Sequence, residues 1–375
     1  MGCGEVAVSA PLFLYGTLCH APLREVVLGL GHVVREAVLP GHRVHWAEGG
    51  DYPVLLPASG EAVGLLVEGL DAEAQARADL FELGFGYALR KVKVEVEGRG
   101  VFTALTYMPE AEVTPGAAWD LAAWAARWGE IWVAAARAAL AGGHDADDLA
   151  RRWPMMKARA ASALRAARAP GHVLRADLTA ARDVEVLHER RPYTEYFALE
   201  DHDLRFRRFD GTMSAPVRRA GFIGGDAVSV LPYDPDLDAV LVVEQFRAGP
   251  FLRGDARPWT LEPIAGRIDP GESAEAALRR EAMEEAGLEL GRLHHVADYY
   301  PTPGAVTEFL FSYVAEARLS GRGGEIGGMD HEDEDIRTHV IPFERLMALI
   351  ASGEVATGPL VLTAFWLAAN RGQLR

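Results

Sequence analysis

One stretch constrains the fold more than any other: "GRIDPGESAEAALRREAMEEAGL", residues 266–288. Ser273 is a favourable N-cap residue, and Gly287 suits the left-handed turn that ends many helices, so the stretch predicts a helix over about 274–286. The helix also carries an apolar stripe, formed by Leu278, Ala282 and Ala286. We therefore expect one face of this helix to pack against a core.

Three glutamates crowd the end of this helix, where negative charge is least favourable. Glu281 and Glu285 are four residues apart and Glu284 lies between them, so all three project over one sector of the surface. Acids in a last turn oppose the helix dipole by roughly 0.3–1 kcal/mol each. A solvated acidic face explains one such acid but leaves three unexplained. A hard divalent cation explains the cluster, because Mg²⁺ prefers carboxylate oxygens and often contacts substrate phosphates.

The loop before the helix is bracketed by Gly266 and Gly271, where the backbone must bend tightly or approach a ligand. Glu272 immediately precedes the helix, and Arg280 is a candidate to pair with it and hold the loop.

The whole stretch resembles the Nudix box: a glycine, five residues, Glu, seven residues, then Arg-Glu-apolar-x-Glu-Glu-x-Gly-apolar. The matching residues are Gly266, Glu272, Arg280, Glu281, Ala282, Glu284, Glu285, Gly287 and Leu288. This family cleaves nucleoside diphosphates linked to another moiety. The resemblance implies that Glu281, Glu284 and Glu285 are metal ligands, with the Ala265 carbonyl as another. Mg²⁺ is the expected cofactor, and Mn²⁺ is an alternative.

Two downstream segments resemble one Nudix subfamily, the ADP-ribose pyrophosphatases. "PTPGAVTE" places Pro303 sixteen residues after Gly287, a spacing that taken alone indicates only a turn. The resemblance puts Glu308 near the substrate ribose. "EDIRTHV" follows an acidic run that would otherwise read as a solvated loop. By resemblance, Glu332 is the catalytic base and Glu334 an additional metal ligand.

The resemblance also makes Arg247, in "VVEQFRAG", a contact to the pyrophosphate rather than a surface ion-pair residue. Gly224 departs from the subfamily, which often has an arginine there; Arg218 or Arg219 is the alternative source of that charge. Tyr196 and Phe197 are candidates either to stack a base or to pack in a core or interface.

The N-terminal region is β-rich and carries "LFLYGTL". The small residues of this loop leave backbone amides free to meet an anion. Residues 11–110 resemble the γ-glutamylcyclotransferase-like (AIG2-like) family, which forms 5-oxoproline without a metal. The resemblance makes Glu82 the acid/base and places the ligand-binding loop at Tyr15, Gly16, Thr17 and Leu18. The alternative is that this small barrel serves only as a binding or docking module.

These observations predict a chain of mixed α+β and α/β class in three parts. Residues 1–115 form a small γ-glutamylcyclotransferase-like β-barrel and 116–172 a helical connector, whose tryptophans we interpret as packing residues rather than base-stacking ones. Residues 173–375 form a Nudix α/β/α sandwich with a mixed sheet. This order resembles a bacterial arrangement associated with tellurite resistance.

The composition of the chain excludes some classes of binding partner. The net charge of −16 argues against nucleic acids and anionic membranes as main partners. Only two cysteines and no membrane-length apolar run indicate a cytoplasmic protein. The main hypothesis is Mg²⁺-dependent hydrolysis of ADP-ribose to AMP and ribose 5-phosphate by a homodimer, the dimer being implied by the resemblance. The alternatives are another nucleotide sugar (GDP-mannose or ADP-glucose), a non-catalytic ADP-ribose sensor, and γ-glutamyl cyclisation.

Overall fold

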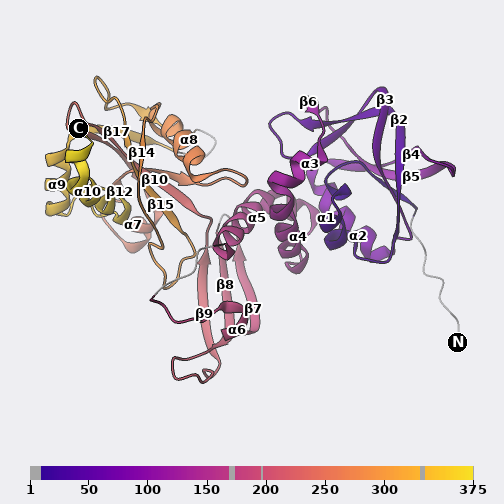
Figure 1. Cartoon of the computed structure of the whole chain (residues 1–375), viewed down its shortest axis with the longest axis horizontal. Helices are drawn as coiled ribbons and strands as arrows, with labels where there is room; N and C mark the ends of the chain where they lie inside the picture. The colour runs from indigo at the N-terminus through magenta and orange to yellow at the C-terminus, as the bar shows by residue number, and fades with distance from the viewer. Residues whose placement is uncertain (1–9, 169–173, 196, 330–333, 375) are drawn as a thin grey trace. The chain divides into compact units, whose positions relative to one another are not determined.

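The computed structural model describes residues 10–168, 174–195, 197–329 and 334–374. It contains two compact units, Met1–Ala169 and Pro170–Arg375 (Figure 1). None of the helices in these described ranges is long and apolar enough to cross a membrane.

The first unit is built on a closed five-stranded barrel, which confirms the predicted small β-barrel. Its strands follow the order β3-β1-β5-β4-β2, and β2 pairs again with β3 to close the ring. The strands are β1 (Leu12–Leu14), β2 (Val33–Ala47), β3 (Pro53–Glu68), β4 (Tyr87–Val96), β5 (Gly100–Pro109) and β6 (Pro115–Ala118), the last of which extends the sheet from β2. Alternate residues of the long strands fill the interior, among them Leu39, Leu66 and Val94.

Helices cover this barrel and share a core with it. They are α1 (Ala21–Leu28), α2 (Ala72–Glu82), α3 (Leu121–Trp124), a π-helical turn (Ala125–Gly129), α4 (Glu130–Ala141) and α5 (Ala146–Ala167), with 3-10 turns at Thr17–Cys19 and Leu83–Phe85. Trp132 packs edge-on between Trp124 and Trp153, with ring centroids 5.5 and 5.1 Å apart. The same core contains Leu12 and Val67 of the barrel, so these tryptophans do pack, as expected. The division into three domains stays a prediction.

Asp51, in the turn between β2 and β3, joins the helices to the barrel. Its backbone carbonyl accepts a hydrogen bond of 2.9 Å from the indole of Trp124. Its carboxylate accepts one of 3.3 Å from the indole of Trp132 and forms an ion pair with Lys157 of α5. Both charged side chains are largely buried, so the pair attaches α5 firmly to the turn.

The second unit contains a mixed sheet of the order β14-β15-β10-β11-β17-β16, in which only the β10–β15 pair is parallel among the described strands. Its strands are β10 (Ala227–Asp234), β11 (Ala239–Phe246), β12 (Trp259–Glu262), β13 (Ile264–Arg267), β14 (Leu293–Tyr299), β15 (Leu310–Glu316), β16 (Ile326–Gly327) and β17 (Ile336–Pro342). Its helices are α7 (Ala248–Arg253), α8 (Ala274–Ala286), α9 (Phe343–Ser352), α10 (Gly358–Asn370) and a 3-10 turn at Arg371–Gln373.

Helices lie on both faces of this sheet, which confirms the predicted α/β/α sandwich. On β10, Val228 and Val230 pack against α8, whereas Leu231 and Tyr233 pack against α9 and α10. The strands expected at "AVSVLPYD" and "AVLVVEQF" are β10 and β11.

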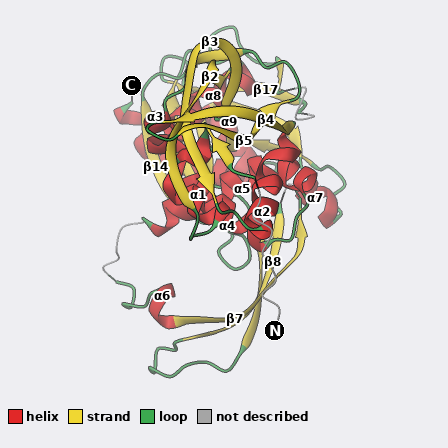
Figure 2. Cartoon of the chain, turned by 90° about the vertical axis from the view of Figure 1, so that its right-hand side faces the viewer, coloured by secondary structure: helices red, strands yellow, loops and turns green. Residues whose placement is uncertain are grey.

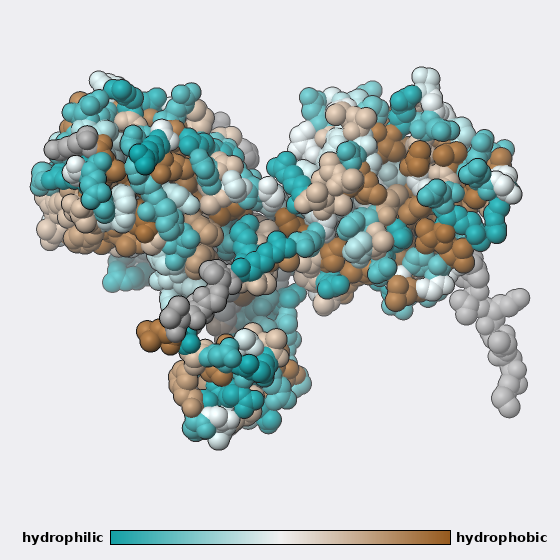
Figure 3. All heavy atoms as spheres, viewed as in Figure 1, coloured by the Kyte–Doolittle hydropathy of each residue, from teal (hydrophilic) through white to brown (hydrophobic). Residues whose placement is uncertain are grey.

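A separate three-stranded sheet precedes the sandwich, and the sequence did not indicate it as a sheet of its own. It consists of β7 (Val184–Thr194), β8 (Ala198–Phe206) and β9 (Val217–Ile223), with the short helix α6 (Ala180–Asp183) at its start. Figure 2 shows α6 at the beginning of β7 and the long β7 beside β8. In Figure 3, hydrophobic residues lie among hydrophilic ones on this part of the surface.

Candidate active sites

Helix α8 has the limits that its sequence predicts. The Ser273 hydroxyl accepts a 3.2 Å hydrogen bond from the Ala276 amide, and Gly287 ends the helix with φ 54°. The apolar stripe is buried against the sheet, with Leu278 and Ala282 fully inaccessible. The helix is therefore fixed at both ends and along one side before its acidic side chains are considered.

The three glutamates of α8 interact, but they do not lie on an open surface. Glu285 is only 2% exposed, and the side chains of Glu281 and Glu284 are 13% and 29% exposed. The expectation of a surface sector is therefore wrong for Glu285. Strand β16 packs closely on this end of the helix, because a Cβ on Gly327 would lie 2.0 Å from the backbone carbonyl oxygen of Glu285.

Arg280 holds the acids together. Its Nη1 group donates to Glu281 at 2.7 Å and to Glu284 at 2.9 Å. Its Nη2 and Nε groups donate to Glu272 at 3.1 and 3.2 Å, and Nη2 also donates to the Arg267 carbonyl at 2.9 Å. Arg280 thus pairs with Glu272 as expected, and it also neutralises part of the cluster.

The acids carry more negative charge than Arg280 can compensate. Burial raises the pKa of Glu281 to about 7, against the lowering effect of Arg280. Burial and the charges of Glu281 and Glu334 raise the pKa of Glu285 well above its ordinary value. The Glu285 Oε2 atom is buried and makes no hydrogen bond within the described residues.

This orphaned carboxylate oxygen is the feature that fits a bound cation. Mg²⁺ takes oxygen ligands, and protein carboxylates are among those it binds. Within the described ranges, no three acidic, histidine or cysteine side chains have already converged on one point. The donor chemistry fits a divalent ion, although Arg280 still engages two of the oxygens.

The glycine that opens the box leaves room for the acid. A Cβ on Gly266 would lie 2.0 Å from the Glu281 carboxyl carbon, so a larger residue there would push this carboxyl group aside. Gly266 and Ala265 lie on β13, where Ala265 pairs with Ser229 of β10. The structure therefore brings the Ala265 backbone beside the acidic end of α8.

Arg247 and Glu308 stand near this cluster. Arg247 binds the Glu262 carboxylate in a bidentate manner, with both N···O distances 2.9 Å. Burial alone would lower the pKa of Arg247, but Glu262 and the nearby charges of Glu285 and Glu334 raise it. Burial raises the pKa of Glu308, and Arg267 and Arg247 partly oppose that effect.

Of the other predicted residues, Glu334 acts on the cluster through its charge. Pro303 is exposed in the turn before β15. Glu334 is partly buried and accepts a 3.4 Å hydrogen bond from the Met329 amide. Glu332 and Tyr196 lie outside the described residues.

The alternative phosphate-binding arginines differ in their availability. Arg218 makes bidentate hydrogen bonds to Asp201 of β8, so its guanidinium is already engaged. Arg219 donates to the carbonyl of Arg218. Phe197 packs on Phe222 of β9, with ring centroids 4.7 Å apart, which fits the packing interpretation of this aromatic residue.

Sequence reasoning missed Glu262, the partner of Arg247. Its signal was a single acid at the end of the short strand "WTLE", four residues before Gly266. Its importance depends on the pairing of β12 with β11, which sets Val243 opposite Glu262. This pairing brings the end of β11, which Arg247 follows, alongside β12.

A second group of chemically competent residues lies in the first unit. The Tyr15 hydroxyl donates to the Tyr107 carbonyl at 2.8 Å, and the Tyr87 hydroxyl donates to the Pro53 carbonyl at 3.1 Å. Gly16 lies against Pro53, because a Cβ there would be 2.5 Å from the proline ring. Glu82, at the end of α2, is half-buried, and burial raises its pKa to about 8.

The predicted loop therefore lies in a tyrosine-lined region that Glu82 shares. The Glu82 carboxyl makes no hydrogen bond to the described residues that would hold it in the ionised form. Its charge raises the pKa of Tyr15 and Tyr87, although burial is the larger cause at both tyrosines. A carboxyl group with a pKa near neutrality is suited to accept and return a proton.

Comparison with known proteins assigns both units. Residues 225–360 match the family model described as "NUDIX domain", and residues 12–126 match "Gamma-glutamyl cyclotransferase, AIG2-like". An ADP-ribose pyrophosphatase of Escherichia coli (strain K12) is 36% identical over 193 residues, which cover 52% of this chain and 91% of the relative. An ADP-ribose pyrophosphatase of Haemophilus influenzae is 34% identical, covering 52% of this chain and 90% of the relative. A GDP-mannose pyrophosphatase of Salmonella arizonae is 30% identical, covering 50% and 95%.

The matched Nudix segment contains α8 and every residue of the box, so the comparison and the geometry agree on the same part of the chain. The chain belongs to the Nudix family, and it carries a domain of the AIG2-like γ-glutamyl cyclotransferase type ahead of its Nudix domain.

Proposed function

We propose that the Nudix domain hydrolyses the pyrophosphate bond of ADP-ribose to AMP and ribose 5-phosphate. The observation that carries this proposal is the 36% identity to an ADP-ribose pyrophosphatase over 91% of that protein. The partnerless buried oxygen of Glu285 adds support, because a cation-dependent reaction needs such a donor.

Mg²⁺ would be held by the Ala265 carbonyl and by carboxylates of Glu281, Glu284 and Glu285, with Glu334 as a further ligand. When bound, the ion would neutralise pyrophosphate charge and lower the pKa of a water molecule. Mn²⁺ has similar ligand preferences and is an alternative.

Side chains of the protein would bind the substrate and accept a proton from the attacking water. Arg247 is held in place by Glu262, and its remaining N–H groups would bind pyrophosphate oxygens. Glu308 would meet the ribose, beside the turn that contains Pro303. Glu332 would take the proton from a water molecule while the oxygen of that water attacks one phosphorus. The phosphoanhydride bond then breaks, and the other phosphate leaves with the electron pair.

The test is turnover of a nucleotide-sugar panel by the full chain with Mg²⁺. ADP-ribose should be the best substrate, and Glu332→Gln should lower kcat about 10²–10⁴-fold, the range for a general base. Glu285→Gln should also lose most activity, whereas the exposed Glu289→Gln is the matched control and should not. Equal rates on ADP-ribose, ADP-glucose and GDP-mannose would overturn the substrate assignment. Binding of ADP-ribose without turnover would favour the sensor alternative.

Gly224 offers a test of substrate choice. A Cβ added at this position, where the subfamily often has arginine, would meet no atom within 4 Å, and the backbone has no left-handed φ, so a side chain fits there. We expect Gly224→Arg to lower the KM for ADP-ribose by adding a phosphate contact. An unchanged KM would show that Gly224 does not limit binding.

A homodimer is also proposed, with the three-stranded sheet as its interface. This sheet leaves several large apolar side chains exposed: Val184, Val186, Tyr193, Phe206 and Phe222. Large apolar side chains at a surface, aromatic ones in particular, are enriched in protein interfaces. Sedimentation of the full chain should give a dimer, and Val186→Lys should shift it to monomer. A cytoplasmic location and the tellurite association stay predictions.

The raised pKa of Glu82 favours a second candidate activity, γ-glutamyl cyclisation. The α-amino nitrogen of a γ-glutamyl compound would attack its γ-carbonyl carbon, and the bond to the leaving amine would break. Glu82 would take the proton from the attacking nitrogen and give it to the leaving amine, which produces 5-oxoproline. Release of 5-oxoproline that Glu82→Gln abolishes would establish this activity. Its absence with all γ-glutamyl dipeptides would leave the barrel as a binding module.

A further inference from the structure

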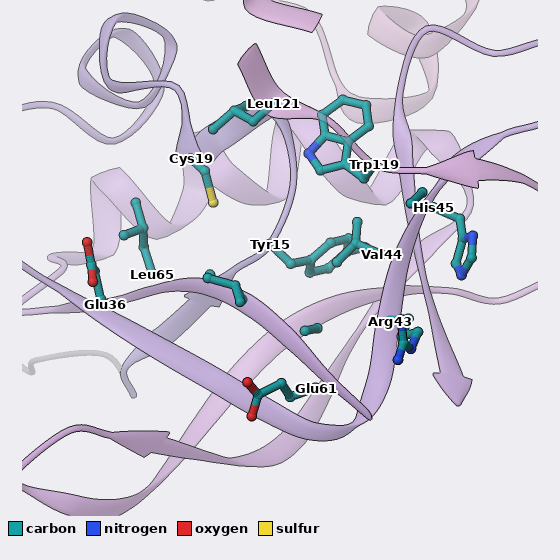
Figure 4. Close-up of a pocket in the computed structure, with 14 residues that line it drawn as sticks. Tyr15, Cys19, Glu36, Arg43, Val44, His45, Glu61, Leu65, Trp119 and Leu121 are labelled. Atoms are coloured by element: carbon teal, nitrogen blue, oxygen red, sulfur yellow. The ribbon is translucent and has the colours of Figure 1, made fainter. Parts of the chain in front are cut away.

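A cavity of about 540 Å³ opens in the first unit, between the β2–β3 hairpin and the chain that enters α3 (Figure 4). Tyr15 contributes to its wall, but Glu82 is not one of its lining residues. Glu82, at which the cyclisation chemistry would take place, therefore lies outside the cavity, although its charge acts on Tyr15.

The floor of the cavity is apolar and rigid. The Tyr15 ring lies in it, held by the hydrogen bond from its hydroxyl to the Tyr107 carbonyl. Trp119 is fixed by its backbone amide, which donates to the Val44 carbonyl at 3.1 Å, and by the Trp46 ring, whose centroid is 4.4 Å away. Cys19 adds a neutral thiol, which donates to the Leu14 carbonyl and whose pKa burial raises to about 12. The floor suits an uncharged segment of a ligand.

The rim of the cavity carries charges of both signs. Glu36 on β2 and Glu61 on β3 are exposed, and neither forms a hydrogen bond or ion pair with the described residues. Arg43 uses its Nε group to bind the Ser59 carbonyl at 2.8 Å, which leaves both Nη groups without a partner in the described ranges.

Contacts with nearby backbone position the side chains of Arg43 and His45. A Cβ on Gly60 would lie 2.9 Å from Nε and Nη2 of Arg43, so the glycine lets the guanidinium lie across the turn. The Nδ1 atom of His45 hydrogen-bonds the Gly116 carbonyl at 3.2 Å and therefore carries the proton, so Nε2 of the neutral ring can only accept a hydrogen bond. Figure 4 shows Arg43 and His45 on one side of Tyr15, with Glu36 on the other and Glu61 below it.

We infer that this cavity binds a small zwitterionic ligand of the peptide class. The ligand's ammonium group would meet Glu36 and Glu61, its carboxylate would meet the Nη groups of Arg43, and its middle would lie over Tyr15 and Trp119. A purely anionic ligand would face two uncompensated acids, and a purely cationic one would face the Arg43 guanidinium. A ligand with both charges satisfies both sides.

The test is calorimetric titration of the full chain with three forms of one dipeptide. The probes are L-leucyl-L-alanine, its C-terminal amide and its N-acetyl derivative, which carry both charges, the positive charge only and the negative charge only. We expect the zwitterion to bind at least about tenfold more tightly than either derivative, since each lost pairing removes a charge-assisted hydrogen bond. Equal affinity for the three forms, or no binding at millimolar concentration, would overturn the inference.

Substitutions in the cavity test which residues bind each charged end of the ligand. Glu36→Gln combined with Glu61→Gln should abolish the preference for the zwitterion over the N-acetyl form, and Arg43→Met should abolish the preference over the amide. Glu97→Gln and Arg99→Met are matched exposed controls in the β4–β5 turn and should change neither. A similar loss in the controls would refute the assignment.

Glu82→Gln should bind the zwitterion like the wild type. Because the readout is binding and not 5-oxoproline formation, failure of the cyclisation proposal leaves this test unaffected. Loss of binding in Glu82→Gln would contradict a cavity distinct from that acid.

Discussion

The half-buried Glu82 should make the first unit less stable as the pH rises. Glu82 has a pKa of about 8 in the folded protein, against an ordinary value of 4.5. Between these values the folded protein holds a proton that the unfolded chain has released, so the free energy of unfolding falls with increasing pH. The loss of unfolding free energy is absent below pH 4.5 and complete above about pH 8.

The size of the effect follows from the two pKa values. Their difference corresponds to about 5 kcal/mol at full burial. Because Glu82 is only half-buried, solvent will screen part of this, and we expect roughly 2–3 kcal/mol. Glutamine resembles the protonated carboxyl group and cannot ionise. Glu82→Gln should therefore match the wild type near pH 5 and exceed it by about 5–10 °C in melting temperature at pH 9, for a unit of this size.

Tryptophan fluorescence can follow this unit within the full chain, because it contains six of the eight tryptophans: Trp46, Trp119, Trp124, Trp128, Trp132 and Trp153. Thermal melts of wild type, Glu82→Gln and the exposed control Glu97→Gln would be recorded from pH 5 to 9. Parallel curves for wild type and Glu82→Gln at every pH would refute the reasoning, since they would mean that Glu82 ionises normally in the folded protein.

Three further predictions concern packing and charge. Gly266→Ala should lower nucleotide-sugar turnover, because its Cβ would displace the Glu281 carboxyl group, and should change stability little, because the end of that side chain can move, as rate assays and urea melts would show. Mg²⁺ should raise the melting temperature of the wild type more than that of Glu285→Gln, as differential scanning calorimetry would show; equal shifts would argue against Glu285 as a ligand. Lys157→Met should lower the unfolding free energy of the first unit by about 3 kcal/mol, because it leaves the Asp51 carboxylate largely buried without its cation; a double variant with Asp51→Asn should recover part of the loss.

The sequence predicted local features well because they depend on nearby residues. Ser273 and Gly287 mark the ends of α8 through hydrogen bonds and backbone angles within a few residues, so the helix limits could be derived directly. The pairing of Arg280 with Glu272 also lies within one helix and its entry loop.

Features that depend on distant residues could not be derived in this way. The end of α8 at Glu285 packs against β16, some forty residues further along the chain, and the role of Glu262 depends on the pairing of β12 with β11. The separate sheet β7–β9 was hidden because its first strand, "VEVLHERRPYT", is mostly polar and exposed and lacks a clear apolar alternation.

The hydrogen bonds of Arg280 have a consequence for how the acidic helix can exist without a metal. Arg280 acts as a resident counter-ion, and two of its partners, Glu272 and the Arg267 carbonyl, are not the proposed ligands. A divalent ion that enters would need to take over only Glu281 and Glu284, while Arg280 keeps its other bonds. Loading would then be an exchange of partners on a preformed helix, with no refolding step. The apparent affinity for the ion would be set by this competition, so it would depend on the arginine as much as on the glutamates.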